Sequence, residues 1–257
     1  DGPLHACQMI RGWDLNCDLG EGESRARTRS LMRWITSANI ACGGHAGDAA
    51  SMRACVALAA AHGVHIGAHP GPWDRANFGR HPVAIDPGQL ELLLLHQVGA
   101  LERIAREGGA RLHHIKLHGG LYHAVEHSPS LALAYLGIVR THWPRVAVYG
   151  RASGAVAAVG RGMPGARVVE EAFIDRGYRA DGSLVPRHEP GALLQETRES
   201  RERVEDLCLR RLVKTREGSE LPLPGVATLC LHGDTPAAPS LARKVRGWLG
   251  TFAPPRR

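Results

Sequence analysis

Short apolar runs alternate with amphipathic segments along the chain. The apolar runs have the length and residue types of buried strands, and they cover residues 13–19, 37–42, 64–68, 112–117, 145–150, 166–173 and 226–231. Most segments between them show helical periodicity, as in residues 90–105, where apolar positions recur every three or four residues. This alternation predicts parallel strands that are joined by crossover helices.

Polar residues mark where several of these helices begin. Asp48 can cap a helix that ends at Gly63, and Asp86 precedes a proline at the first helical position. Ser128 also precedes a proline and predicts a third helix start. Further helices are expected over residues 153–159, 196–213 and 240–249.

The positions of the polar residues favour a closed barrel over an open doubly wound sheet. In an open sheet the ligand crevice forms mainly at one switch point, whereas every strand of a barrel contributes to one mouth. Here candidate reactive side chains lie on, or follow, six of the seven predicted strands. We therefore predict an α/β fold of the (β/α)7 barrel type, with residues 1–257 forming a single domain.

Composition agrees with this fold and argues against two classes of partner. Hydrophobic residues make up 44% of the chain, and the net charge of +7 comes from arginines that are spread evenly along it. We therefore expect neither nucleic-acid binding nor, without a long apolar run, a membrane span. The six cysteines are scattered without a C-x-x-C pair, which favours reduced thiols and a cytoplasmic location.

The segment "IKLHGGLYH" (115–123) places Lys116 and His118 two positions apart at the end of an apolar run. Along a strand these side chains face the same side, and burying two cationic groups is costly unless something uses them. Helices predicted on both sides favour a parallel strand over a hairpin. We expect the pair to face the barrel mouth, with Gly119 and Gly120 turning the chain away.

Two H-x-x-x-H motifs end at His69 and His118. On a helix such histidines can share one zinc ion, but the nearby glycines favour extended chain, where they stand about 13 Å apart. We therefore expect neither pair to share an ion. A divalent ion bound by residues from different strands and a polar network without metal both remain open. The candidate ligands are Asp14, His45, His69 and His232.

Two glycine-rich segments and one long polar segment complete the motifs. Residues 160–165 match G-x-G-x-x-G but follow a predicted helix, so we interpret them as a turn, and no P-loop is present. Residues 150–154 follow a strand and could bind an anion, although a simple turn is favoured. Residues 170–187 predict a shaped loop or lid in which Arg176 and Arg187 could bind a carboxylate or phosphate, unless they are incidental surface arginines.

Six blocks of this sequence resemble the LamB/YcsF family, whose proteins form the A component of 5-oxoprolinase. They occur in family order from residue 13 to 235 and read "DLNCDLGEG", "SANIACGGHAGD", "GAHPGPWDRANFGR", "KLHGGLY", "EEAFIDRGYRADGSLVPR" and "CLHGD". The resemblance implies a distorted (β/α)7 TIM-like barrel, similar to the glycoside hydrolase/deacetylase superfamily. It also implies ATP-dependent opening of 5-oxo-L-proline to L-glutamate, together with partner subunits B and C.

The same resemblance indicates which residues could carry the chemistry. The predicted catalytic residues are Asp14, His45, His69, Lys116, His118 and His232, and the metal ligands, if an ion is bound, are Asp14, His45 and His69. The predicted substrate-binding residues are Asn16, Glu171, Asp175, Arg176 and Arg187, while Asp18, Asp48 and Asp234 also match family motifs. Gly44, Leu117 and His123 depart from the family pattern, and Gly44 is expected to open space beside His45.

Hydrolysis of a lactam needs a base, a group that stabilises developing negative charge and a clamp for the substrate carboxylate. We assign Asp14 or His69 as base, Lys116 with His118 to charge stabilisation, and Arg176 or Arg187 to the carboxylate. ATP is expected as a co-substrate that is bound with the partner subunits. The alternatives are a stand-alone metal-dependent amide hydrolase related to deacetylases and a binding module that delivers a lactam.

Overall fold

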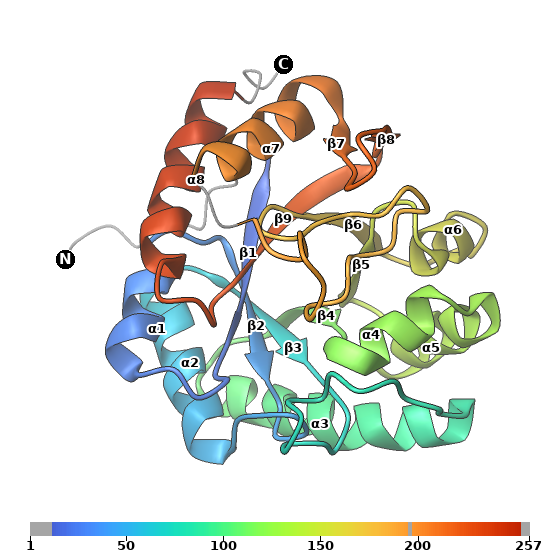
Figure 1. Cartoon of the computed structure of the whole chain (residues 1–257). Coiled ribbons are helices and arrows are strands. Elements are labelled where there is room, and N and C mark those ends of the chain that lie inside the picture. Colours follow the sequence, from blue (N-terminus) through green and yellow to red (C-terminus); the bar gives the residue numbers. More distant parts are fainter. Residues whose placement is uncertain (1–11, 195–196, 253–257) are drawn as a thin grey trace.

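The computed structural model describes residues 12–194 and 197–252. Within them, seven parallel strands close into a barrel in the order β1-β2-β3-β4-β5-β6-β9, surrounded by helices (Figure 1). The barrel strands are β1 (Asp14–Leu19), β2 (Ser37–Ala41), β3 (His65–His69), β4 (Leu112–Lys116), β5 (Ala147–Arg151), β6 (Val168–Phe173) and β9 (Val226–His232). The predicted fold class is therefore confirmed.

Eight helices occur in the described part of the chain. They are α1 (Arg25–Met32), α2 (Ala49–His62), α3 (Pro87–Glu107), α4 (Gly119–Glu126), α5 (Pro129–His142), α6 (Ala155–Arg161), α7 (Thr197–Arg210) and α8 (Ala238–Phe252). The predicted caps are confirmed: the Asp48 carboxylate accepts the Ser51 N–H at the start of α2, and Gly63 ends that helix at φ 65°. Asp86 caps α3 in the same way through Gln89.

The structure corrects three local expectations. Gly119 and Gly120 do not form a turn; they open α4, with His118 as its N-cap residue. The helix predicted over 196–213 ends at Arg210, and its first residue lies outside the described residues. The last residues of that segment instead enter a small antiparallel hairpin of β7 (Leu212–Lys214) and β8 (Glu220–Pro222), which the sequence did not predict.

Side-chain alternation along each strand separates an apolar shell from a polar barrel interior. On β1, Leu15, Cys17 and Leu19 are completely buried in the apolar core. Asp14, Asn16 and Asp18 alternate with them and face the interior, because successive side chains of a strand point to opposite faces. The interior therefore holds three polar levels, and only the uppermost reaches the mouth. None of the described helices is long and apolar enough to cross a bilayer.

Candidate active site at the barrel mouth

Asp14 belongs to the lowest polar level. Its carboxylate accepts hydrogen bonds from Ser37 Oγ at 2.7 Å, Tyr149 Oη at 3.0 Å and Thr228 Oγ1 at 2.5 Å, and from Thr36. Its hydrogen-bonding capacity is thus occupied by neighbouring strands. The structure does not bring Asp14 to His45 or His69, so the predicted base and metal ligand is here a structural carboxylate at the closed end of the barrel.

The middle level connects a buried histidine to the mouth. His114 Nε2–H donates to Asn39 Oδ1 at 2.6 Å, and Asn39 Nδ2 donates at 2.7 Å to both Asn16 Oδ1 and Asp18 Oδ1. Gly67 is required opposite His114, because a Cβ there would lie 2.0 Å from the imidazole. Asn16, predicted to bind substrate, is therefore part of this internal network and does not line the pocket.

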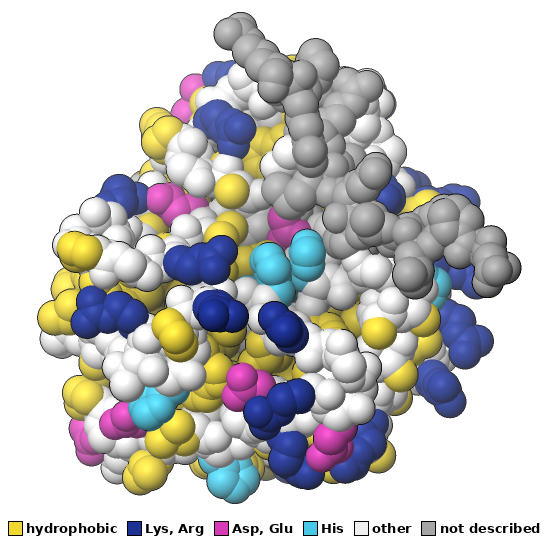
Figure 2. Space-filling model, turned by 180° about the vertical axis from the view of Figure 1, so that it is seen from behind, with side chains coloured by type: hydrophobic (Ala, Val, Ile, Leu, Met, Phe, Trp, Pro, Cys, Tyr) yellow, Lys and Arg dark blue, Asp and Glu magenta, His cyan; other side chains and the backbone are white. Residues whose placement is uncertain are grey.

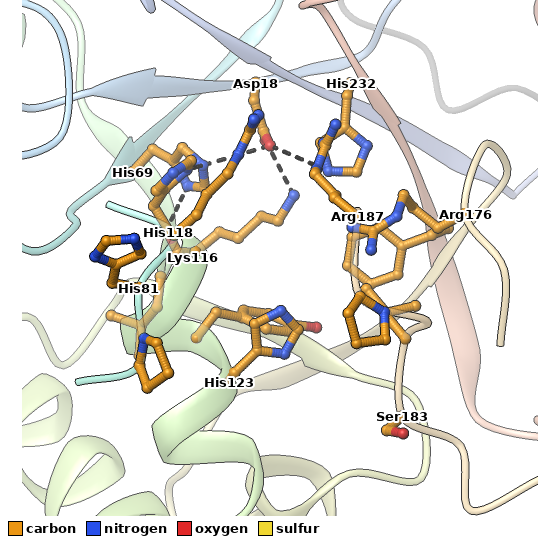
Figure 3. Close-up of a pocket in the computed structure, with 18 of the residues that line it drawn as sticks. Asp18, His69, His81, Lys116, His118, His123, Arg176, Ser183, Arg187 and His232 are labelled. Carbon is orange, nitrogen blue, oxygen red and sulfur yellow. Dashed lines mark hydrogen bonds and ion pairs between the residues drawn. The ribbon is translucent and has the colours of Figure 1, made fainter. Parts of the chain in front are cut away.

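Asp18 is the central charge of the uppermost level (Figure 3). Its Oδ1 lies 3.0 Å from Lys116 Nζ, while its Oδ2 lies 3.4 Å from His69 Nε2 and 3.9 Å from His232 Nε2. Burial alone would raise the pKa of Asp18, but His69 and Lys116 outweigh it and hold the pKa well below its usual range. Three strands thus direct cationic or imidazole groups onto one ionised carboxylate.

Lys116 is the buried cation of the site, with 2% of its surface exposed. Besides Asp18, its Nζ contacts Cys230 Sγ at 3.0 Å and Glu171 Oε2 at 3.5 Å. Burial lowers the pKa of Lys116, yet Asp18, Cys230 and Glu171 together raise it well above its ordinary value. Lys116 therefore stays protonated. Glu171, by contrast, is fully buried and has its pKa raised by that burial, and it does not line the pocket.

Three histidines and one glutamate form a compact cluster beside Asp18. His45 Nε2 lies 2.9 Å from Glu21 Oε1, and His118 Nδ1 lies 3.3 Å from the same oxygen and 2.9 Å from His69 Nε2. The ligand atoms of all four side chains lie within 4.8 Å of one another. Burial lowers the pKa of His45 to about 4 despite its bond to Glu21, and it lowers the pKa of His118 as well.

Glu21 was not among the predicted site residues. It lies in the loop after β1, where Gly20 and Gly22 both have positive φ angles. The only sequence signal for it was its place inside the block "DLGEG", and its distance from the other members is decided by the loop. Glu21 occupies the position in the cluster that the sequence analysis gave to Asp14.

His232 at the end of β9 forms a second arrangement with Asp175. The Asp175 carboxylate accepts the backbone N–H of His232 at 2.9 Å and its Nδ1–H at 3.0 Å. The hydrogen on Nδ1 leaves the lone pair on Nε2, which faces the pocket and Asp18. Asp175, predicted to bind substrate, holds His232 in the structure and is not among the residues that line the pocket.

Arginines from two loops form the rim of the pocket. Arg176 donates through Nε to Ala192 O and through Nη2 to Val185 O, so much of its donor capacity shapes the loop after β6. Arg80 and Arg187 instead share a single carboxylate, Asp234, at 2.9 and 3.1 Å. Two guanidinium groups on one carboxylate leave a net positive charge facing the pocket. Arg80 was not predicted, although it ends the block "GAHPGPWDRANFGR".

The site opens into a cavity of about 650 Å³. Of the residues just described, those that line it are Asp18, Glu21, His69, Lys116, His118, His232, Arg80, Arg176 and Arg187. The loop predicted over 170–187 supplies one wall through Arg176, Arg187 and their neighbours (Figure 3). The volume is typical of small-molecule sites. On the face seen in Figure 2, Lys and Arg side chains form separate groups between acidic and apolar ones, with no continuous basic stripe.

The departures from the family pattern have different consequences. Gly44 does not open space beside His45, because Gln97 fills that space: a Cβ on Gly44 would lie 2.5 Å from Gln97 Nε2 and 2.4 Å from Gly71 O. Gln97 is held there by hydrogen bonds to both backbone groups of Gly71. Leu117 and His123 both line the pocket, and burial lowers the pKa of His123 to about 4.

One further motif residue and the two glycine-rich segments have structural roles. Asp48 caps α2, as described, and does not line the pocket. The turn over residues 150–154 is built around the buried Glu126 side chain, which accepts from Arg151 N at 2.7 Å and from Val156 N at 3.3 Å. A carboxylate of the chain itself thus takes the place of an external anion. The segment over 160–165 connects α6 to β6 as the expected turn.

A model of the LamB/YcsF family matches residues 13–253. The chain belongs to the LamB/YcsF family. Among solved structures, this LamB/YcsF protein is similar to the lactam utilization protein from Thermus thermophilus, with 35% identity, a TM-score of 0.82, and 93% of this chain and 96% of that chain covered. The predicted family membership is thereby confirmed.

Two other solved structures show weaker similarity to this LamB/YcsF chain. A deacetylase solved with its substrate is 10% identical with a TM-score of 0.47, covering 96% of this chain and 88% of that chain. A family 39 glycoside hydrolase from Bacteroides cellulosilyticus is 13% identical with a TM-score of 0.41, covering 93% and 65%.

Proposed function

We propose that this protein hydrolyses the lactam ring of 5-oxo-L-proline to give L-glutamate, as one component of an ATP-dependent 5-oxoprolinase with partner subunits B and C. The observation that carries the proposal is the mouth of the barrel, where a protonated Lys116 and an oriented His232 meet at Asp18 beneath an arginine rim. Support also comes from the similarity to a protein described as a lactam utilization protein.

Each chemical requirement of lactam opening has a residue to meet it. The substrate carboxylate is bound by Arg187 and Arg80, whose shared Asp234 leaves them positively charged as a pair. Lys116 stabilises the negative charge that develops on the lactam oxygen. We assign this role to Lys116 without His118, the partner expected from the sequence, because Phe78 O accepts the Nε2–H of His118 and its Nδ1 faces His69.

His232 is the base in this proposal. Its Nδ1–H is held by Asp175, so Nε2 can take a proton from a water molecule that attacks the carbonyl carbon. The C–N bond of the ring then breaks, and the nitrogen becomes the amino group of glutamate. His69, the base predicted from the sequence, lies in the histidine cluster with its Nδ1–H donated to Lys116 O.

ATP explains how a stable amide is opened. Transfer of the terminal phosphoryl group of ATP to the lactam oxygen would release ADP and make the ring carbon a better electrophile. Attack by one water molecule and cleavage of the C–N bond would then give an acyl phosphate, which a second water molecule would hydrolyse to the side-chain carboxylate of glutamate and phosphate. Because the sequence has no P-loop, we propose that ATP is bound together with the partner subunits. A cytoplasmic location is part of the same proposal, since the five cysteines of the described residues are free thiols.

The test is a reconstituted assay. The purified chain is incubated with 5-oxoproline and ATP, with and without subunits B and C, and both glutamate and phosphate are measured. The proposal expects equal amounts of the two products only in the complete mixture. No glutamate in any mixture would contradict it.

A second candidate is a stand-alone metal-dependent amide hydrolase, and the cluster of Glu21, His45, His69 and His118 favours it. This function predicts hydrolysis of acyl amides without ATP or partners, and loss of that activity in a chelator. Chelator-insensitive activity that requires ATP would exclude it.

A further inference from the structure

The protonation of His69 and His118 can be assigned from their outer hydrogen bonds. His69 Nδ1 lies 2.8 Å from Lys116 O, and His118 Nε2 lies 2.8 Å from Phe78 O. A carbonyl oxygen only accepts, so each of these nitrogens carries the hydrogen. In the neutral rings the inner nitrogens, His69 Nε2 and His118 Nδ1, therefore present lone pairs.

These lone pairs converge on each other and on a carboxylate. The two inner nitrogens are 2.9 Å apart, and Glu21 Oε1 lies 3.3 Å from His118 Nδ1 and 3.8 Å from His69 Nε2. Three electron-rich atoms at such distances in a buried place repel one another unless a proton or a metal cation lies between them. Among the described residues, no lysine or arginine forms an ion pair with Glu21.

A second group of potential ligands, beside the first, differs from it in containing a lysine. Asp18, Cys230 and His232 also present three potential ligand atoms close together. There, however, the Lys116 ammonium already lies 3.0 Å from both Asp18 Oδ1 and Cys230 Sγ. The Asp18 group thus already contains a lysine, whereas the Glu21 group consists only of a carboxylate and imidazoles, all of which can bind a metal ion.

We propose that Glu21, His45, His69 and His118 bind one divalent ion of the first transition row, such as Zn²⁺. Four ligands at Zn–N and Zn–O distances of 2.0–2.1 Å are roughly 3.3 Å apart in a tetrahedron. The three contacts of Glu21 with the histidines and the contact between His69 and His118 measure 2.9 to 3.8 Å, and all the ligand atoms lie within 4.8 Å of one another. Three imidazoles and one carboxylate suit zinc and its neighbours, while Mg²⁺ and Ca²⁺ prefer oxygen ligands.

The surroundings resemble those of a metal site. Backbone carbonyls that accept the outer N–H of histidine ligands fix the tautomer and the ring orientation. One of these carbonyls belongs to Phe78, whose φ of 56° lies in the left-handed region. A residue other than glycine holds that conformation only at a steric cost. The strained residue therefore supports His118 directly.

His45 is the ligand that moves. Its ring is stacked on that of His118, with centroids 3.5 Å apart and an interplanar angle of 3°, and one ion cannot lie in both parallel ring planes. His45 Nδ1 has no hydrogen-bond partner among the described residues, so no outer bond opposes a tilt of this ring. Nε2 already faces Glu21.

Metal binding can be measured without any assay of activity, so the inference does not rest on the proposed function. The full chain is stripped with a chelator and titrated with Zn²⁺ in competition with a chromophoric chelator, and Co²⁺ is added separately to record its visible absorption. We expect one ion per chain, a four-coordinate Co²⁺ spectrum and a higher melting temperature with Zn²⁺.

Two variants and a control locate the site. Glu21→Gln keeps the size of the side chain, and both it and His69→Ala should weaken Zn²⁺ binding by about 100-fold or more. His65→Ala is the matched control, because His65 begins the same strand and stacks on His113 away from the mouth. It should bind Zn²⁺ as the unaltered chain does.

Three outcomes would overturn the inference. They are the absence of a stoichiometric ion in the unaltered chain, Zn²⁺ affinity unchanged by Glu21→Gln, and equal loss in His65→Ala. If His69→Ala does not fold, Glu21→Gln decides, since circular dichroism can show that its fold is intact. Failure of glutamate formation with an intact Zn²⁺ site would contradict only the proposed function.

Discussion

Lys116 Nζ lies 3.0 Å from Asp18 Oδ1, and the two side chains are 2% and 4% exposed at the barrel mouth. They come from β4 and β1, which do not pair with each other. A buried ion pair that spans the barrel in this way holds a full positive charge next to the pocket. It also makes each partner depend on the other for its charged state.

Replacing Lys116 should therefore abolish activity and weaken the fold. In Lys116→Met we expect glutamate formation by the reconstituted mixture to fall by at least about 100-fold, and the free energy of unfolding to fall by about 3–5 kcal/mol because Asp18 loses its partner. Steady-state rates and urea denaturation measure the two effects. The exposed Lys214→Met is the control, and unchanged rates in Lys116→Met would refute the assignment of Lys116.

Asp175→Asn tests the orientation of His232. The amide can no longer hold Nδ1–H in the same way, so the lone pair is lost from Nε2 in part of the molecules. We expect kcat to fall by roughly 10²–10⁴-fold with little change in KM. Asp181→Asn, which alters a carboxylate bonded to Ser183 N on the same loop, should leave both constants unchanged. A change confined to KM would indicate substrate binding by Asp175.

We expect Arg187 to bind the carboxylate of the substrate. In Arg187→Gln one guanidinium beside Asp234 is lost, so the KM for 5-oxoproline should rise by about 10-fold or more, while kcat stays within about twofold. Arg216→Gln removes a surface ion pair with Glu189 instead and serves as control. A fall in kcat at unchanged KM would contradict the role of Arg187 in substrate binding.

Glu126 should make stability depend on pH. Burial raises its pKa from 4.5 to about 7, so the folded state binds more protons than the unfolded state between these values. Stability from this group is therefore complete below pH 4.5 and is lost as the pH rises through 7, by on the order of 3 kcal/mol. Urea denaturation at several pH values should show this loss in the unaltered chain and a smaller one in Glu126→Gln. If the free energy of unfolding depends on pH equally in the unaltered chain and in Glu126→Gln, Glu126 does not titrate in this range.

Gly44→Ala tests the packing that replaced the expected open space. The added Cβ would approach Gly71 O to 2.4 Å and Gln97 Nε2 to 2.5 Å, so we expect a loss of about 1–3 kcal/mol in the free energy of unfolding. Gly99→Ala in α3 meets no atom within 4 Å and should be stabilising by about 1 kcal/mol. Thermal denaturation of both variants distinguishes a tight site from an open one.

The helix caps and strand runs were predictable because their signals are local. Asp48 and Gly63 limit α2 through contacts within a few residues, and hydrophobic periodicity reports the face that a helix buries. The start of α4 at Gly119 was missed for the same reason. The glycines that begin α4 lie against the loop that follows β3, with Gly119 close to Gly79 O. The sequence offers no local sign of that contact.

The sequence by itself determined the seven strands, their parallel arrangement and the chemical types gathered at their ends. Only the tertiary structure decided how far each polar side chain lies from the mouth of the barrel. Asp14 and Asp18 share one strand and one face, yet one lies in the lowest polar level and the other at the mouth, about 13 Å apart. Glu21 and Arg80 reach the site from loops. Their distances from His69 and Asp234 depend on how the barrel closes, which no spacing along the chain encodes.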